Sequence, residues 1–179
     1  MPKLVIITHP DLSTSTVNKL WLEELQKFPN EYVIHSLYNK YPKLDFDIEA
    51  EQALLSKYSE IIFQFPIHWF SIPFALKKYI DEVFSYGWAF GPGGDKLAGK
   101  RIGFAVSTGG METSYSAGEG IPVATLLNDV ALSFKYCGCE IAHLHVFHGA
   151  MFAPTRQALV ENARVYVQSF LTEMSTASS

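Results

Sequence analysis

Short apolar segments alternate with amphipathic helical segments along the whole chain, and this alternation limits the folds open to it more than any other feature. Each apolar segment is short and rich in β-branched residues, as buried strands are. Apolar residues at helical spacing follow each of them. This pattern predicts a parallel sheet with helices on both faces. The strands are expected at Lys3–Thr8, Glu31–Leu37, Glu60–Phe65, Arg101–Ser107 and Glu140–Phe147.

The helical segments are bounded by residues that commonly cap helices. Ser13, Thr14 and Ser15 are candidate N-caps of the first helix, whose apolar face is expected to run from Val17 to Phe28. Residues 38–46 read as a polar loop, and Gly138 suits the left-handed position after a helix. The other helices are expected after Asp47, after Pro73, from Pro122 to Cys137 and from Pro154 to Leu171.

Five parallel strands in 179 residues fit the doubly wound α/β fold of the flavodoxin type, with strand order 2-1-3-4-5. A single domain is expected over residues 1–173, followed by a disordered tail at residues 174–179. In this strand order, the loops after the first, third and fourth strands meet at the carboxyl edge of the sheet. Ligands of open α/β sheets bind at that edge.

Composition and charge exclude several classes of function. The net charge is -4 and no block of Lys or Arg stands out, which argues against nucleic acid as a partner. The first residues lack a secretory signal, and no apolar run is long enough to cross a membrane. Cys137 and Cys139 form C-G-C, which is neither a redox nor a zinc spacing. We therefore expect a cytoplasmic protein with reduced thiols.

Each of the three converging loops has its own chemistry. The first, residues 9–18, places hydroxyls and backbone N–H groups at a helix N-terminus, which suits a phosphate. The second, residues 66–70, carries flat rings, and the third, residues 107–110, offers unhindered backbone beside hydroxyls. Helix capping, an exit loop packed on its own core and an ordinary glycine turn are the respective structural alternatives. Together, the three loops indicate a site for a flavin mononucleotide moiety.

Several motifs give the chain a family resemblance. They are His9-Pro10, Ser15–Asn18, YPKLDFDIEAEQ from Tyr41, QFPIHWFSIPFALKKYIDEVFSYGWAFGPGG from Gln64, and STGGMETSY from Ser107. On these residues the chain resembles the NAD(P)H:quinone oxidoreductases of the flavodoxin-2 type. It is most similar to the short bacterial branch that includes the ancillary quinone reductase of glutathione-regulated potassium efflux systems.

The resemblance implies a role for each loop. The flavin phosphate and ribityl chain are expected at His9, Ser15, Thr16, Val17 and Asn18. The isoalloxazine is expected against Pro66, Ile67, His68, Trp69 and Phe70, with its pyrimidine edge at Ser107, Thr108, Gly109 and Gly110. Relatives are homodimers whose sites are covered by aromatic residues of the partner, and Trp88 and Phe90 match those positions.

The resemblance also implies an activity. A nicotinamide, NADPH or NADH, passes a hydride to the flavin, and a quinone then takes the same place, which implies ping-pong kinetics. Tyr115 matches a catalytic Tyr, but no His lies between Gly110 and Pro122 to match the family's catalytic His. The cofactor is left open between FMN and FAD. We favour FMN because a chain this short has little material for an adenine pocket.

Two other classes of function are an electron carrier and a regulatory partner of a membrane transporter. A one-electron carrier like flavodoxin is disfavoured by the mild net charge of -4. A regulatory partner of a membrane antiporter, held at the inner face of the membrane, is compatible with catalysis and stays open. His143, His145 and His148 form H-x-H-x-x-H, but no carboxylate or Cys lies at a matching spacing, so no metal site is expected.

Overall fold

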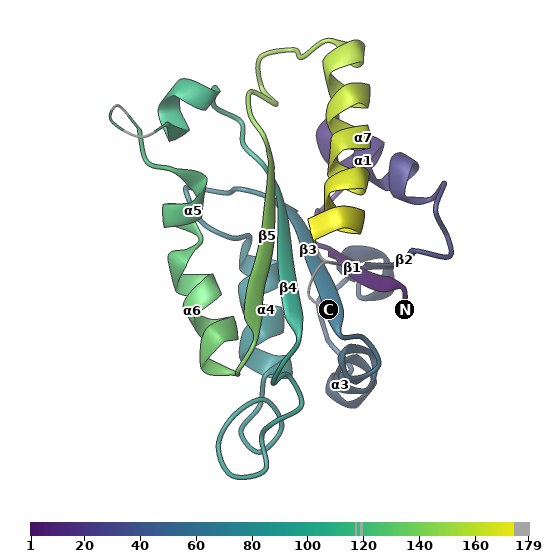
Figure 1. The fold of residues 1–179 in the computed structure, drawn as a ribbon, viewed down its shortest axis with the longest axis vertical. Coiled ribbons are helices and arrows are strands. Elements are labelled where there is room, and N and C mark those ends of the chain that lie inside the picture. The colour runs from purple at the N-terminus through teal and green to yellow at the C-terminus, as the bar shows by residue number, and fades with distance from the viewer. Residues whose placement is uncertain (117, 119, 174–179) are drawn as a thin grey trace.

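The chain folds around one parallel sheet covered by helices on both faces (Figure 1). The computed structural model describes residues 1–116, 118 and 120–173, so the predicted disordered tail lies outside the described residues. The strands lie in the order β2-β1-β3-β4-β5 and every neighbouring pair is parallel, which confirms the predicted fold. They are β1 Lys3–Ile7, β2 Tyr32–Ser36, β3 Glu60–Pro66, β4 Arg101–Ser107 and β5 Glu140–Phe147.

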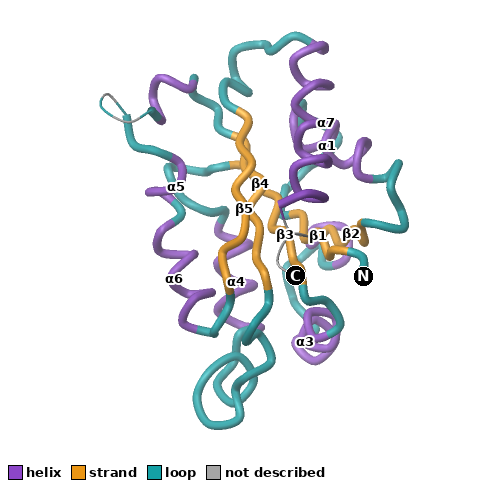
Figure 2. The backbone as a smooth tube through the Cα atoms, in the orientation of Figure 1, coloured by secondary structure: helices purple, strands orange, loops and turns teal. Residues whose placement is uncertain are grey.

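The helices form two layers. In Figures 1 and 2, α1 and α7 lie on one side of the sheet, and α4, α5 and α6 lie on the other. The buried residues form two clusters that divide in the same way. One includes residues of α3 to α6, and the other includes residues of α1 and α7. The helices are α1 Val17–Leu25, α2 Leu37–Lys40, α3 Ile48–Ser56, α4 Phe74–Val83, α5 Val123–Leu126, α6 Asn128–Tyr136 and α7 Arg156–Glu173, with a 3₁₀ turn η1 at Glu112–Tyr115.

Strand β1, which lies between β2 and β3, supplies both cores. Leu4 and Ile6 pack toward the α3–α6 layer, and Val5 and Ile7 pack toward α1 and α7. Side chains alternate along a strand, so an unbroken apolar run is what a strand buried on both faces requires. Burying each of these side chains contributes about 1.5–3 kcal/mol. This burial explains why the apolar pattern located the strands.

The first helix is shorter than its apolar pattern predicted. It ends at Leu25, and Phe28 is 38% exposed, so the assignment of Phe28 to the buried face was wrong. Phe28 instead lies in the turn leading to β2, where its carbonyl accepts the N–H of Tyr32 at 3.1 Å. At the other end, the Oγ of Ser15 accepts the N–H of Asn18 at 3.0 Å, as a capping side chain does.

The helix expected from Pro122 to Cys137 is broken into α5 and α6. Leu127 separates them with φ of -93° and ψ of 0°. The break precedes Asn128 and Asp129, which are weak helix formers. The end of α6 follows the prediction, because Gly138 has φ of +82°. Its N–H bonds to the carbonyl of Lys135, and the N–H of Cys139 bonds to that of Phe134, as in a Schellman motif.

The short helix α2 lies where no helix was expected. Its first residue, Leu37, was expected to end the second strand, and residues 38–40 were expected to be loop. Asp47, expected at the start of a helix, caps α3 by accepting the N–H of Ala50 at 3.0 Å. Cys137 and Cys139 are free and buried, and burial raises the pKa of both thiols, that of Cys139 to about 12. Protonated thiols are poor nucleophiles.

A buried carboxylate ties the α3 layer together. Glu51 of α3 is 1% exposed and accepts hydrogen bonds from the hydroxyls of Tyr41 at 2.7 Å and Tyr79 at 2.9 Å. Its other contact is the Nε2 of His35 on β2, at 2.9 Å. We call these four residues the Glu51 cluster. Because every partner meets one carboxylate, the cluster links β2, the loop before α3, and α4.

Candidate active site

A cavity of about 270 Å³ opens at the carboxyl edge of the sheet. It brings together the three loops that the sequence predicted to meet, those after β1, β3 and β4. A fourth loop, between β5 and α7, completes its wall. The lining residues are His9, Thr14, Ser15, Thr16, Val17, Asn18, Pro66, Ile67, His68, Ser107, Gly109, Ala150 and Met151.

His9 presents one hydrogen-bond donor at the cavity. Its Nδ1 accepts the backbone N–H of Asp11 at 3.2 Å, so the neutral ring carries its proton on Nε2. Burial lowers the pKa of His9, and the neighbouring His68 lowers it further, whereas Asp11 opposes the shift. A neutral His9 therefore keeps an Nε2–H group available to a ligand.

The start of α1 supplies backbone donors to the same cavity. Within residues 1–116, 118 and 120–173, the amides of Thr16 and Val17 donate to no protein acceptor. Unpartnered amides at a helix N-terminus attract anions, because the helix dipole adds to their partial positive charge. This end of the cavity is therefore suited to a phosphate group.

A buried chain of hydrogen bonds holds the floor of the cavity. The amide of Asn18 on α1 donates to the Oγ of Ser107 at 3.0 Å. The amide of Gln64 on β3 donates to the backbone and side-chain oxygens of Asn18 at 3.2 and 3.3 Å. Gln64 in turn accepts the hydroxyl of Tyr166 on α7 at 3.2 Å. We call Asn18, Gln64, Ser107 and Tyr166 the Asn18 cluster, and it fixes the loops after β1 and β4 relative to each other.

The loop after β3 is a strained turn. His68 and Ser71 exchange two backbone hydrogen bonds of 3.0 Å, which closes a two-residue hairpin. The two central residues, Trp69 and Phe70, have φ of +48° and +62°. Such a turn normally uses Asn or Gly there, because other side chains are disfavoured at positive φ. Strain of this kind is typical of functional sites.

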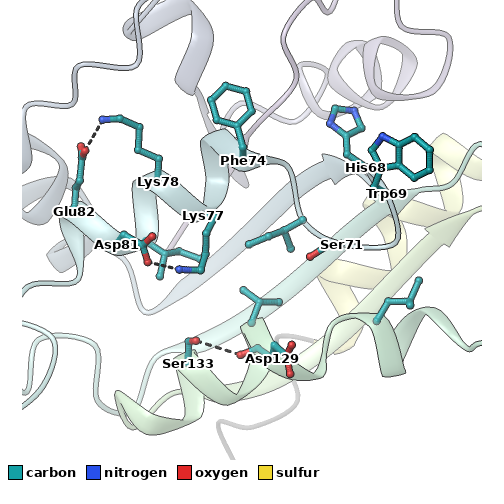
Figure 3. Close-up of a pocket in the computed structure, with 14 residues that line it drawn as sticks. His68, Trp69, Ser71, Phe74, Lys77, Lys78, Asp81, Glu82, Asp129 and Ser133 are labelled. Carbon is teal, nitrogen blue, oxygen red and sulfur yellow. Dashed lines mark hydrogen bonds and ion pairs between the residues drawn. The ribbon is translucent and has the colours of Figure 1, made fainter.

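The ring systems of this turn are divided between two places. Pro66, Ile67 and His68 line the cavity. Trp69 is 94% exposed and lies at the mouth of a neighbouring groove, beside His68 (Figure 3). Phe70 is exposed and lines neither hollow. The structure thus brings three of the five predicted wall residues to the cavity itself.

The glycine loop is bound through its carbonyls to the loop after β5. The carbonyls of Thr108, Gly109 and Gly110 accept the N–H groups of residues 150, 151 and 149 at 2.9, 3.3 and 2.7 Å. Among the described residues, the amides of Gly109 and Gly110 donate to no protein acceptor. A Cβ on Gly109 would approach the Sδ of Met151 to 2.7 Å. Thr108 is fully buried, and neither Thr108 nor Gly110 lines the cavity.

Tyr115 folds back over the glycine loop but does not line the cavity, and its catalytic role stays a prediction. It ends η1, and its ring carbon lies 3.3 Å from the point where a Cβ on Gly110 would be. Its hydroxyl lies 3.5 Å from that same point. The hydroxyl is therefore held close to the glycine-loop backbone and can act as a donor there.

Trp88 and Phe90 lie far from this cavity in their own chain. Their loop precedes β4 and forms the long loop at the bottom of Figure 1, whereas the cavity follows the carboxyl ends of the strands. Seven-residue β4, about 23 Å long, separates the two ends. Both side chains are half-buried against the core. They can cover a site only if it belongs to another copy of the chain.

A long groove runs between α4 and α6, next to the cavity. Figure 3 shows part of it, where Lys77 of α4 faces Asp129 and Ser133 of α6 across the hollow. Two hollows of about 860 and 600 Å³ make up the groove and share residues of both helices. It carries large exposed apolar side chains, which are Phe74, Tyr86, Leu132 and Tyr136.

The three histidines of the H-x-H-x-x-H motif are used separately. His143 contacts the Oγ of Ser169 at 3.0 Å, and His145 contacts the Oδ1 of Asn162 at 2.9 Å. His148 contacts Thr108 instead. No cluster of three or more metal-ligating side chains occurs among the described residues. In the same part of the chain, no helix is both long and apolar enough to cross a membrane.

The loop after β5 was missed by the sequence-based reasoning. Ala150 and Met151 line the cavity, and His148 lies just outside it. Thr14, predicted only as a cap, also lines the cavity. The available signal was topological, because this loop also follows the carboxyl end of a strand that neighbours β4.

Comparison with known proteins places the chain in a family. Residues 1–171 match the flavodoxin-2 family model, described as a flavodoxin-like fold, and the chain belongs to this family. A curated relative is the uncharacterised NAD(P)H oxidoreductase YrkL of Bacillus subtilis, 39% identical over 84% of this chain and 87% of that protein. Another is the glutathione-regulated potassium-efflux system ancillary protein KefF of Salmonella typhi, 37% identical over 94% of each chain.

Two solved structures are similar over almost the whole chain. The general stress protein 14 of Treponema denticola, in complex with FMN, is 36% identical with a TM-score of 0.87, covering 94% of this chain and 97% of its own. The NADPH-quinone reductase of P. pentosaceus is 28% identical with a TM-score of 0.83, covering 96% and 98%. These comparisons confirm the predicted family and the predicted class of enzyme, an NAD(P)H oxidoreductase.

Proposed function

We propose that this protein is an FMN-dependent NAD(P)H:quinone oxidoreductase that works by ping-pong hydride transfer. One observation carries the proposal: the same cavity is lined by Thr16 and Val17 at the start of α1 and by Gly109 of the glycine loop, whose amides donate to no acceptor among the described residues, and by the ring systems of Pro66 and His68. A ligand with a phosphate at one end and a flat polar ring at the other matches that arrangement. The similarity to an FMN complex and to a quinone reductase supports it.

The residues present fit FMN group by group. The amides of Thr16 and Val17 and the Nε2–H of His9 would hold the phosphate. Pro66, Ile67 and His68 would lie along the ring, and the amides of Gly109 and Gly110 would meet its pyrimidine edge. Bound FMN supplies the hydride chemistry between a nicotinamide and a quinone. The protein orients the ring, and Tyr115 donates a hydrogen bond where negative charge develops.

The proposal is tested by the visible spectrum of the purified protein. We expect a bound flavin that NADPH or NADH bleaches and a quinone restores. Thr16→Glu should weaken FMN binding more than ten-fold, because a carboxylate would then face the phosphate. Ser13→Glu is the matched control, since exposed Ser13 lies in the same loop but does not line the cavity. A colourless protein that takes up neither FMN nor FAD would contradict the proposal.

The active unit proposed here is a homodimer. The groove between α4 and α6 exposes Phe74, Tyr86, Leu132 and Tyr136, an apolar surface that a second copy would cover. Trp88 and Phe90 lie at the end of the sheet opposite to the cavity of their own chain. In such a dimer they would cover the cavity of the other subunit. The cavity would then be closed by the partner, which keeps water from the ring.

A charge in the groove should dissociate the dimer. Leu132 is 67% exposed on α6, so Leu132→Glu should give a monomer by light scattering with strongly reduced turnover. Val165→Glu is the matched control, because Val165 is 49% exposed on α7, on the other side of the sheet. Trp88→Ala should lower turnover more than flavin retention. A fully active monomer would refute the dimer.

A second role as the ancillary subunit of a membrane antiporter is favoured by one observation. The similarity to an ancillary protein of a potassium-efflux system extends over 94% of the chain. We place the protein in the cytoplasm, bound through such a partner to the inner face of the membrane. Pull-down with the antiporter from solubilised membranes tests this role. The ancillary role and the enzyme activity are compatible, so the pull-down tests only the ancillary role and turnover tests only the enzyme activity.

A further inference from the structure

His148, which follows β5, is stacked on Tyr115. The ring centroids of His148 and Tyr115 are 5.3 Å apart and their planes are inclined by 20°. Tyr115 in turn lies over Gly110, as described above. A histidine from one end of the chain thus reaches the same tyrosine and glycine loop that the site uses. The sequence analysis predicted no histidine next to Tyr115.

Two hydrogen bonds at Thr108 determine which nitrogen of His148 carries the proton. The Oγ1 of Thr108 lies 2.9 Å from the carbonyl oxygen of Gly110 and 2.9 Å from the Nδ1 of His148. A carbonyl oxygen can only accept, so the single hydroxyl proton of Thr108 goes to Gly110. The Nδ1 of His148 must then be the donor to Thr108. In the neutral ring, Nε2 is therefore unprotonated and basic.

The backbone fixes this arrangement in place. The N–H of Gly149, the residue after His148, bonds to the carbonyl of Gly110 at 2.7 Å. The N–H of Ala150 bonds to the carbonyl of Thr108 at 2.9 Å, and the N–H of Thr108 bonds to the carbonyl of Phe147 at 2.9 Å. His148 therefore cannot shift without displacing the glycine loop.

We propose that His148 is a positioning residue of the active site, which holds Tyr115 over the glycine loop and binds one proton at Nε2 when negative charge lies against that loop. The proposal rests on the proposed function for the source of that charge. The proton comes from solvent and returns to it when the charge leaves. Because the proton goes to Nε2, the Nδ1–H bond to Thr108 is retained in both states.

The charges around His148 suit such a role. Burial lowers the pKa of His148, and Glu112 of η1 opposes the shift by favouring the charged ring. Tyr115 is the titratable group in ring contact with it. If the His148 ring is neutral in the resting protein, it can take up a proton, and a nearby negative charge favours the protonated form. An imidazolium stacked on Tyr115 also gains a cation–π contribution.

The first experiment counts protons. His148→Asn keeps an N–H donor near the position of Nδ1 but removes the basic nitrogen. Reduction potentials of the FMN-bound protein, measured across pH 5 to 9, should show one more proton taken up per two electrons in wild type than in His148→Asn. His143→Gln on β5 is the control and should match wild type. Equal proton counts in wild type and His148→Asn over the whole range would overturn the proposal.

The second experiment does not need the flavin. Nitrogen NMR of the full-length, flavin-free protein reports the tautomer of His148, which should be Nδ1–H in wild type. Thr108→Val removes the acceptor, so the ring should change to the Nε2–H form. Tyr115→Phe should keep the lowered pKa of His148 because the stack is retained, and Tyr115→Leu should raise it. An Nε2–H tautomer in wild type would refute the inference even if FMN binding and turnover are as proposed.

Discussion

The two buried polar clusters differ in where their hydrogen bonds end. In the Glu51 cluster, three side chains meet one carboxylate, and the set is closed within the protein. The Asn18 cluster runs from Tyr166 through Gln64 and Asn18 to Ser107, and Asn18 and Ser107 also line the cavity. One cluster therefore joins elements for stability, and the other ends at a site.

The helix starts near the two clusters have similar caps, because Asp47 caps α3 and Ser15 caps α1. They differ in their surroundings, because the start of α1 lines the cavity. Near the Asn18 cluster, in the part of the chain that the structure describes, amides of Thr16, Val17, Gly109 and Gly110 lack protein acceptors. Unpartnered donors weaken a fold unless a ligand or water satisfies them. Mutations in the two clusters should therefore separate stability from ligand binding.

The largest effect is expected at Glu51. Glu51→Ala leaves two tyrosine hydroxyls and His35 without their shared acceptor, and we expect a loss of about 3 kcal/mol in the free energy of unfolding. Urea unfolding measures it. Glu49→Ala, which removes an exposed carboxylate in the first turn of the same helix, is the control and should cost only about 0.3 kcal/mol. Equal losses in the two variants would contradict the assignment of the cluster.

The contribution of Glu51 should also depend on pH. Burial acts to raise its pKa, but the hydrogen bonds from His35, Tyr41 and Tyr79 outweigh burial and lower it. A carboxyl with a lowered folded-state pKa stabilises the fold above its unfolded pKa and loses that contribution as the pH falls through the folded value. Wild type should therefore lose stability in acid, and Glu51→Ala should lose less over the same range.

A smaller loss of stability, with a larger effect on binding, is expected at Asn18. Asn18→Ala removes the link between Gln64 and Ser107 and should cost about 2 kcal/mol of unfolding free energy. FMN affinity should fall about ten-fold, because the loops after β1 and β4 lose their common support. Calorimetric titration of the folded variant with FMN gives the second number. Unchanged affinity would show that the floor of the cavity does not depend on this cluster.

The sequence predicted the sheet well because each strand is an apolar segment of its own. Its failures occur where one dihedral angle or a distant contact decides the structure. The break at Leu127 changes one residue's conformation within an otherwise helical pattern. Phe28 kept the helical spacing although the helix had already ended. Local patterns carry no information about either event.

The same distinction between local patterns and distant contacts applies to the candidate site. Loops that follow strands could be placed together from topology, which is why most of the cavity lining was anticipated. The stack of His148 on Tyr115 joins two loops far apart in sequence, and no spacing rule indicates it. The positive φ angles of Trp69 and Phe70 could not be expected either, because those side chains disfavour that conformation.

An intermediate effect, on rate alone, is expected at Tyr115. Tyr115→Phe keeps the ring over Gly110 but removes the hydroxyl. Flavin reduction by NADPH should slow about ten-fold, equivalent to about 1.4 kcal/mol, with little change in FMN affinity. Stopped-flow absorbance measures the rate. The amides of Gly109 and Gly110 share the stabilisation of charge, which keeps the effect below that of a sole donor. An unchanged rate constant would remove Tyr115 from the active site.

The smallest expected change in stability has the opposite sign. Trp69 and Phe70 occupy the two positive-φ positions of the His68–Ser71 turn, where Asn and Gly are strongly preferred. The double variant Trp69→Asn, Phe70→Gly should therefore stabilise the protein by about 1 kcal/mol, since it relieves strain in an exposed turn. FMN affinity should fall at the same time, because the same turn holds His68, which lines the cavity, and a more mobile turn would position it less well. Thermal unfolding with and without FMN separates the gain in stability from the loss of FMN affinity. The gain in stability must appear in the flavin-free protein. If the double variant is less stable without FMN, the two aromatic side chains contribute packing that outweighs the strain, and the contrast between a stabilising cluster and a strained site fails at this loop.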